Sequence, residues 1–185
     1  MSPLRFRDPR STKYDFLERI LVTCPGCGGE AYVVPAPGEE VAEPVRAGYS
    51  RPRRFACHGC GLTKTTDSRQ IAFSRGTRHA ATDPYFDLPL RLQTRTRHGW
   101  LWAYDHEHLT LIENYVRATL RERAPWYDNG QKMTLVARLP RWIKQARHRD
   151  EVLRALARIS AATPAPVTDP EPEPPARHIR FQGGR

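Results

Sequence analysis

The sequence predicts an α+β protein in which short antiparallel strands and a β-hairpin precede a set of C-terminal helices. Three patterns lead to this prediction. Two paired-cysteine motifs, at residues 24–27 and 57–60, are flanked by segments of β-type composition. Residues 90–105 alternate between apolar and polar side chains, as strands do. After residue 105, apolar residues recur at the spacing of an amphipathic helix.

The cysteine motifs lie in a β-rich unit that we expect to span residues 20–66. ILVT leads into the first motif, and RRFAC and LTKTT surround the second, which predicts short strands there. Residues 35–52 hold four prolines and three glutamates without periodicity, so they are predicted to be an inserted loop. Residues 1–19 precede the unit as a basic N-terminal arm, loose over residues 1–13.

Residues 90–105 are predicted to form a hairpin. A two-residue turn at His98–Gly99 pairs Arg97 with Trp100, Arg95 with Trp102 and Gln93 with Tyr104. Arginines and aromatic rings then share one face, and the leucines lie on the other. The basic, aromatic face is either a stacking platform for bases, or its two tryptophans belong to the core and the arginines lie along their edges with head groups in water. We prefer the second interpretation because large aromatic rings are usually buried.

The first predicted helix covers residues 106–123. Asp105 is placed to cap its N-terminus. Its apolar stripe consists of Leu109, Ile112, Val116 and Leu120. Pro125 and the Asn129–Gly130 dipeptide are expected to end it.

The remaining chain is predicted to continue the helical part and then to lose structure. A basic helical segment is interrupted at Pro140, and Asp150 is expected to cap a last helix. Hairpin and helices together make up residues 67–160, packed against the β-rich unit. Residues 161–185 form a proline-rich tail that cannot build a core, so we expect it to be disordered.

Charge and composition bear on partners and compartment. The formal net charge is +10, and Arg and Lys outnumber acidic residues by ten to three over residues 51–99 and by eight to two over 131–160. Two basic segments favour a polyanionic partner, although arginine can also serve solubility alone. No run approaches the ~20 apolar residues of a membrane span, and the N-terminus lacks the apolar stretch of a secretory signal. We therefore expect a soluble, cytoplasmic protein.

The four cysteines have the spacing of metal ligands. Cys24 and Cys27 form one motif, Cys57 and Cys60 the other, and each pair is followed by glycine. Two thiolates two residues apart can chelate one ion in a tight turn, where glycine takes positive φ without strain. Two such turns predict one structural Zn²⁺ in a closed Cys₄ site, with iron as the alternative for soft thiolates.

CPGCG and CHGCG resemble the knuckles of the zinc-ribbon superfamily over residues 20–66. The resemblance implies two knuckles at the tips of β-hairpins. The 29 residues between the motifs exceed the usual gap of ~15–20, which the inserted loop can absorb. DPYFDLPLRLQ and GWLWAYDHEHL are similar to segments of small bacterial zinc-ribbon proteins of unassigned function, so the wider resemblance brings no activity.

Two histidine motifs are predicted not to bind metal. His106 and His108 lie two residues apart, so on a helix their imidazoles point to different faces; capping or solvent exposure is the preferred interpretation for His106–Glu107–His108. His58 lies in a knuckle whose four ligand positions are taken by sulfur, so it is expected near the site or exposed.

Candidate phosphate contacts come from both basic segments. They are Arg51, Arg53, Arg54, Arg95, Arg97, Arg141, Lys144 and Arg147. A solvated basic face without a partner is the alternative interpretation of the helical ones.

No catalytic motif is present, since GxxxxGK[ST], GxGxxG and GxSxG are all missing. We therefore predict a non-catalytic, zinc-binding protein that binds DNA or RNA, as an accessory subunit of a larger assembly. A protein-interaction adaptor built on the same zinc unit is the first alternative. A metal-dependent hydrolase is the second, with Mg²⁺ held by carboxylates such as Asp83, Asp87, Asp105, Glu107 and Glu113.

Overall fold

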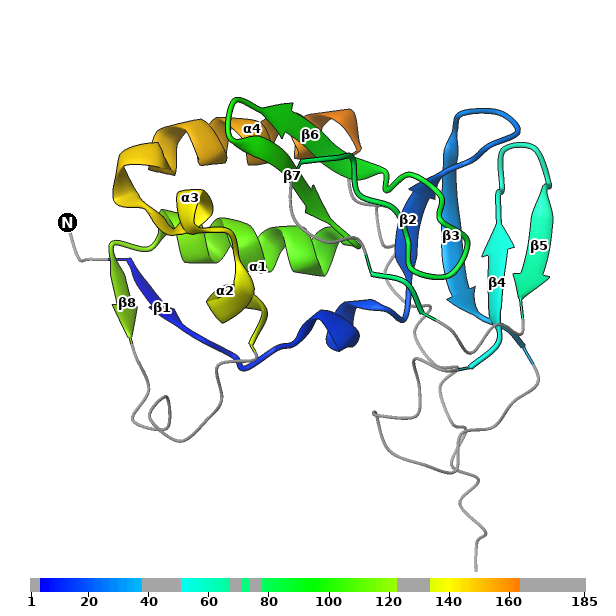
Figure 1. The fold of residues 1–185 in the computed structure, drawn as a ribbon, viewed down its shortest axis with the longest axis horizontal. Helices are drawn as coiled ribbons and strands as arrows, with labels where there is room; N and C mark the ends of the chain where they lie inside the picture. The colour runs from blue at the N-terminus through cyan, green and yellow to red at the C-terminus, as the bar shows by residue number, and fades with distance from the viewer. Residues whose placement is uncertain (1–3, 38–50, 67–70, 74–77, 123–133, 164–185) are drawn as a thin grey trace, which may run out of the picture.

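The computed structural model describes residues 4–37, 51–66, 71–73, 78–122 and 134–163, and within them the predicted α+β fold is confirmed (Figure 1). The strands are β1 (Arg5–Arg7), β2 (Ile20–Thr23), β3 (Glu30–Pro35), β4 (Arg53–Ala56), β5 (Thr63–Thr66), β6 (Leu92–Thr96), β7 (Gly99–Ala103) and β8 (Leu120–Glu122). The helices are η1 (Lys13–Phe16), α1 (His106–Arg117), α2 (Leu135–Arg138), α3 (Arg141–Lys144), η4 (Ala146–His148) and α4 (Arg149–Ala162). None of these helices combines the length and apolarity needed to cross a membrane.

Four antiparallel strands, in the order β2-β3-β4-β5, form the sheet at one end of the molecule (Figure 1). Both cysteine motifs lie in the turns of this sheet, between β2 and β3 and between β4 and β5. Ile20, Val22, Val33 and Phe55 bury one face of it. Most of the predicted inserted loop, residues 38–50, lies outside the described residues.

Strand β2 also joins the sheet to the hairpin region. The edge of β2 that does not pair with β3 bonds to a later segment of the chain. The Leu21 N–H donates to the Tyr104 carbonyl and the Thr23 N–H to the Pro89 carbonyl, both at 2.8 Å. Buried side chains of the sheet, the hairpin and the helices belong to one apolar cluster. The four-stranded sheet and the region of hairpin and helices therefore share a core.

The hairpin turn differs from the prediction. β6 pairs with β7 so that Thr96 faces Gly99, Arg95 faces Trp100 and Gln93 faces Trp102. The turn is therefore Arg97–His98, and the predicted turn at His98–Gly99 is wrong. The Thr96 side chain sets this register, because its Oγ1 donates to the Gly99 carbonyl at 2.7 Å and accepts the His98 N–H at 3.2 Å. A two-residue shift keeps the predicted faces, since strand side chains alternate with period two.

Helix α1 begins as predicted but ends early. Asp105 is its N-cap, and Oδ1 accepts the His108 N–H at 2.7 Å. The helix stops at Arg117 rather than residue 123, because the N–H groups of residues 119 and 120 both donate to the Leu4 carbonyl. Leu120 is thus 42% exposed in β8 and does not continue the buried helical stripe.

The N-terminal segment is part of the fold. β1 pairs in parallel with β8, which places Phe6 against Arg121 in the ladder and buries its ring. The expectation of a loose arm over residues 1–13 is therefore wrong for residues 5–7, and η1 starts with a capping box between Thr12 and Asp15. The sequence could not predict this pairing, because β1 has only three residues and the paired residues of β8 lie 115 positions further along the chain.

The C-terminal helices pack apolar side chains against the core. α4 buries Val152, Ala155, Leu156 and Ile159. α2 and α3 are separated at Pro140, as expected. Asp150 lies in the first turn of α4 and not at its cap, which is His148 without a side-chain capping bond. The expected helix stop around residues 125–130 lies outside the described residues, as does the proline-rich tail from residue 164 onward.

His108 is buried, so the expectation that the His106–Glu107–His108 motif caps or faces solvent is wrong for this residue. Its ring stacks on Phe16 with centroids 4.9 Å apart, and Nδ1 accepts the Tyr104 N–H at 3.2 Å. Burial lowers the pKa of His108 to about 3. The imidazole is therefore neutral in the folded protein at all moderate pH values, while Glu107 is exposed and His106 half-buried.

The buried His108 should make the protein less stable as the pH falls. Its folded pKa lies far below 6.5, so below about pH 6.5 the unfolded chain takes up a proton that the folded chain does not, and stability is lost. We expect this group to cost roughly 1–2 kcal/mol between pH 7 and pH 5. In His108→Gln this part of the loss should disappear, as measured by urea unfolding at both pH values.

The matched control is His79→Gln, which changes an exposed histidine. It should keep the wild-type difference between the two pH values. An unchanged difference in His108→Gln would contradict a buried neutral imidazole.

Candidate metal centre

The two cysteine motifs form two matching knuckles. In the first, the Cys24 N–H donates to the Gly29 carbonyl at 2.8 Å and the Gly28 N–H to the Cys24 carbonyl at 2.9 Å. The second repeats both bonds one-for-one around Cys57, with Leu62 and Gly61 as partners. Gly28 and Gly61 have φ values of +70° and +74°, as the sequence predicts for these positions.

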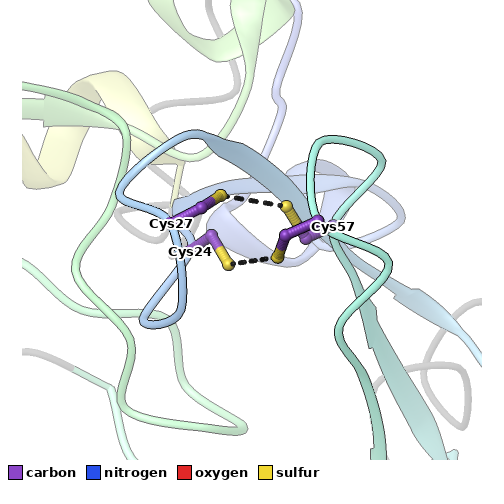
Figure 2. A group of neighbouring side chains, drawn as sticks. Cys24, Cys27 and Cys57 are labelled. Atoms are coloured by element: carbon purple, nitrogen blue, oxygen red, sulfur yellow. Dashed lines mark hydrogen bonds between the residues drawn. The ribbon is translucent and has the colours of Figure 1, made fainter.

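All four sulfurs converge between the knuckles. Figure 2 shows the sulfurs of Cys24, Cys27 and Cys57 turned toward the space between the two loops. The sulfurs of Cys24 and Cys60 lie 3.6 Å apart, as do those of Cys27 and Cys57, and all four are within 4.8 Å of one another. A tetrahedral ion with Zn–S bonds of ~2.3 Å requires sulfurs about 3.8 Å apart. The cluster is therefore compatible with one zinc ion.

The thiols influence one another's ionisation. Burial raises the pKa of Cys24, but N–H groups of Cys27 and Gly26 and the neighbouring thiols together lower it to about 7. At Cys60 the Leu62 N–H lowers the pKa, yet the sulfurs of Cys57 and Cys24 raise it to about 12. Four thiolates this close repel one another unless a cation lies between them, which is what a bound metal ion supplies.

The surroundings favour a structural site over a reactive one. Cys24 and Cys57 are buried, while Cys27 and Cys60 are exposed at the outer side of the knuckles. With four sulfur donors no coordination position is left for water or substrate. His58 is exposed, and its ring lies edge-on to Tyr32 at 5.9 Å, so it takes no part in the sulfur cluster.

The predicted phosphate contacts fall into two groups. Arg53 and Arg54 begin β4 of the four-stranded sheet, and Arg51 lies two residues before it. Arg53 is only 1% exposed: Nη1 donates to the Leu17 carbonyl at 2.8 Å and its guanidinium lies 4.7 Å from the centre of the Tyr85 ring. Arg53 is therefore part of the core, and its prediction as a phosphate contact is wrong.

The second group lies around the β6–β7 turn and the helices beside it. Arg95, Arg97, Arg141 and Arg147 are exposed. Arg97 pairs with Glu151 of α4 at 2.8 Å, and Arg147 is next to His148, whose ring centre lies 4.2 Å from that of His98. Lys144 is half-buried and its Nζ donates to the Ala137 carbonyl at 2.9 Å. Tertiary packing thus brings Arg97 and Arg147 to one place.

Both hairpin tryptophans border a hollow that the sequence did not predict. Trp100 and Trp102 are half-buried and line a cavity of about 660 Å³, together with His108. Lys13 and Arg138 contribute cationic groups to the same wall. Trp102 packs edge-on against Tyr104, with centroids 5.0 Å apart, so its ring borders the core, but neither tryptophan is fully buried as the core interpretation requires. Four separate chain segments line this hollow, so no local sequence pattern predicts it.

The carboxylates considered for Mg²⁺ do not converge. In the described parts of the chain, groups of three or more potential metal ligands occur at the four cysteines and at His98, His148 and Glu151. Neither includes Asp83, Asp87, Asp105, Glu107 or Glu113. Asp83 is buried and accepts backbone N–H groups of residues 85, 86 and 88, so it orders its own loop.

No protein-family model, curated protein or solved structure matches the chain. The assignment of the sulfur cluster therefore rests on its geometry.

Removal of one sulfur ligand should release the metal ion and open the sheet. We expect freshly purified, reduced protein to carry one Zn²⁺ per chain and Cys57→Ser to lose most of it, because three ligands leave an exchangeable position. Metal analysis and the thermal midpoint of unfolding measure both effects. His58→Ala, in the same knuckle, should keep the ion; wild-type protein without zinc or iron would contradict the site.

Proposed function

We propose that this protein is a non-catalytic, zinc-ribbon-type protein that binds nucleic acid through the surface around the β6–β7 turn. The observation that carries the proposal is the meeting of cations from two parts of the chain: Arg97 from the hairpin and Arg147 from the segment before α4 approach the same histidine pair. Exposed Arg95 and Arg141 extend this basic surface. Guanidinium groups in such a cluster suit phosphate oxygens, which they can bind bidentately.

The chemistry of the remaining chain supports a binding role. A closed Cys₄ site gives rigidity and leaves no position for substrate. The net charge of +10 draws a polyanion from a distance. Phosphate contacts of this kind carry affinity without sequence information, so the proposal concerns DNA or RNA as a class. A cytoplasmic location and membership of a larger assembly remain parts of the proposal.

A protein-interaction adaptor is the second candidate, and the hollow beside Trp100 and Trp102 favours it. The cavity of about 660 Å³ is bordered by aromatic and aliphatic side chains with few polar groups. Surfaces of this composition bind apolar side chains of partner proteins. The two candidates predict different responses to salt, because only phosphate binding releases many counterions.

Replacing exposed cations around the β6–β7 turn should weaken nucleic-acid binding. We expect Arg95→Gln, Arg141→Gln and Arg147→Gln together to lower affinity for every oligonucleotide alike. The slope of log K against log[salt] should flatten by up to about 3 units if each side chain contacts a phosphate. Fluorescence anisotropy with single- and double-stranded DNA and RNA, over a series of salt concentrations, measures this.

The control makes the same change of net charge away from the turn: Arg5→Gln, Arg117→Gln and Arg158→Gln, all at exposed positions. It should retain most of the wild-type affinity and slope. Equal losses in both triple variants would mean diffuse attraction without a defined surface, and no binding by wild-type protein at low salt would favour the adaptor.

Trp102→Ala should act on stability first. Its ring is half-buried and contacts Tyr104 and His108. We expect a loss of roughly 2–3 kcal/mol in the free energy of unfolding, below the ~3–5 kcal/mol of a fully buried aromatic ring. Chemical denaturation beside an oligonucleotide titration separates this role from base stacking, which would instead lower affinity in a protein of unchanged stability.

A further inference from the structure

Three potential metal ligands meet where the β6–β7 turn lies against the start of α4. His98 belongs to the turn, His148 ends η4, and Glu151 lies in the first turn of α4. One donor atom of each residue lies within 4.8 Å of the other two. His148 and Glu151 are three residues apart, the spacing that puts two side chains on one face of a helix. Hairpin and helix thus supply one set of donors.

Each imidazole faces a neighbouring guanidinium through its Nε2 atom. Arg97 Nε donates to His98 Nε2 at 3.2 Å, and Arg147 Nε donates to His148 Nε2 at 3.1 Å. A guanidinium has only donors, so each Nε2 acts as the acceptor and carries the lone pair that a metal ion requires. The Arg97 and Arg147 guanidiniums, which contact the two Nε2 atoms, are themselves cations.

The Glu151 carboxylate completes the set. Its Oε2 lies 3.3 Å from His98 Nε2 and 2.8 Å from Arg97 Nη2. This oxygen is buried, yet within the described structure no donor makes a well-aligned hydrogen bond to it. Two acceptor atoms 3.3 Å apart repel each other unless a proton or a metal ion lies between them. The spacing matches the edge, about 3.3–3.4 Å, of a tetrahedral zinc site with bonds of ~2.0–2.1 Å.

We propose that His98, His148 and Glu151 form a second metal site for a divalent ion of intermediate softness, such as Zn²⁺ or Co²⁺. Two imidazoles and one carboxylate are a donor set that zinc accepts while keeping a fourth position for water. The ion takes the place of the Arg97 and Arg147 guanidiniums. Their displacement is easy, because Arg147 is exposed and the Arg97 side chain is 70% exposed.

The positive surroundings set the order of affinity. The three donors carry one negative charge against the two charges of the ion, with Arg97 and Arg147 nearby. The sulfur site offers up to four negative charges. The second site therefore fills after the first.

The test titrates Co²⁺ into full-length protein whose cysteine site already holds Zn²⁺. We expect native mass spectrometry to find one additional Co²⁺ per chain, with the visible d–d absorption of nitrogen and oxygen ligands and no thiolate-to-cobalt charge-transfer band. His98→Ala and Glu151→Gln should each weaken this binding about tenfold or more. His79→Ala, at an exposed position outside the cluster, should leave it unchanged.

Arg97→Ala separates a metal site from an ordinary hydrogen-bonded cluster. Because Arg97 competes for both His98 and Glu151, its removal should raise Co²⁺ affinity severalfold; a merely structural cluster would gain no affinity. Thermal melts confirm that each variant is folded. No additional Co²⁺ in either wild-type protein or Arg97→Ala would overturn the proposal, and so would additional Co²⁺ that persists in His98→Ala.

Discussion

The fold depends on the position of strand β2, which has hydrogen-bonded neighbours on both edges. One edge pairs with β3 over four residues. The other bonds to the 89–104 segment through the N–H groups of Leu21 and Thr23, and the Arg91 N–H returns a bond to the Leu21 carbonyl at 3.0 Å. Buried backbone groups must be paired, so this strand can be satisfied only when the sheet and the hairpin region are both in place. Cys24 follows β2 directly, and the sulfur cluster is thereby attached to the core.

This arrangement gives the metal centre a mechanical role. The four sulfurs come from two knuckles, and an ion bound between them would tie β2 and β3 to β4 and β5. β5 is an edge strand whose residues are mostly exposed, so it has little apolar burial to hold it. A bound ion would stabilise a small sheet of this kind, as structural zinc sites do. On the core side the sheet is held by apolar packing and by buried Arg53, whose bond to the Leu17 carbonyl and contact with the Tyr85 ring offset part of the several kcal/mol that burying a charge costs.

The hairpin tip concentrates polar chemistry at the opposite side of the core. The His98 ring stacks on Trp142 at 5.5 Å and meets His148 edge-on, so the turn is held in a defined position against α4. Guanidiniums here bond to imidazole nitrogens and to a carboxylate, which reduces their mutual repulsion. In a surface of this kind, the exposed guanidiniums can bind phosphates. The imidazole nitrogens and the carboxylate oxygen lie beneath these guanidiniums. The sulfur cluster and the nitrogen–oxygen cluster thus lie at different ends of the fold and differ in donor chemistry.

The sequence by itself determined the local structures whose signals span a few residues. The spacing of the cysteines and the glycines at positions 28 and 61 specify knuckles, because a five-residue turn with positive φ is closed by its own backbone bonds. Alternation over residues 90–105 likewise determined which side chains share a hairpin face. Asp105 determined where α1 begins, because a cap acts within three residues.

Only the tertiary structure decided features that depend on distant partners. Helix α1 ends at Arg117 because the N–H groups of Thr119 and Leu120 donate to the Leu4 carbonyl. Leu4 is far from the helix in sequence, so no residue near Arg117 predicts this contact. Arg53 looks like any other arginine in its basic segment, yet packing places it over Tyr85 in the core. His98 and His148 are 50 positions apart and follow no shared pattern, so their meeting is a result of the hairpin lying on α4. Short-range signals are carried by the local chain itself, whereas long-range contacts are chosen by the burial of the whole core.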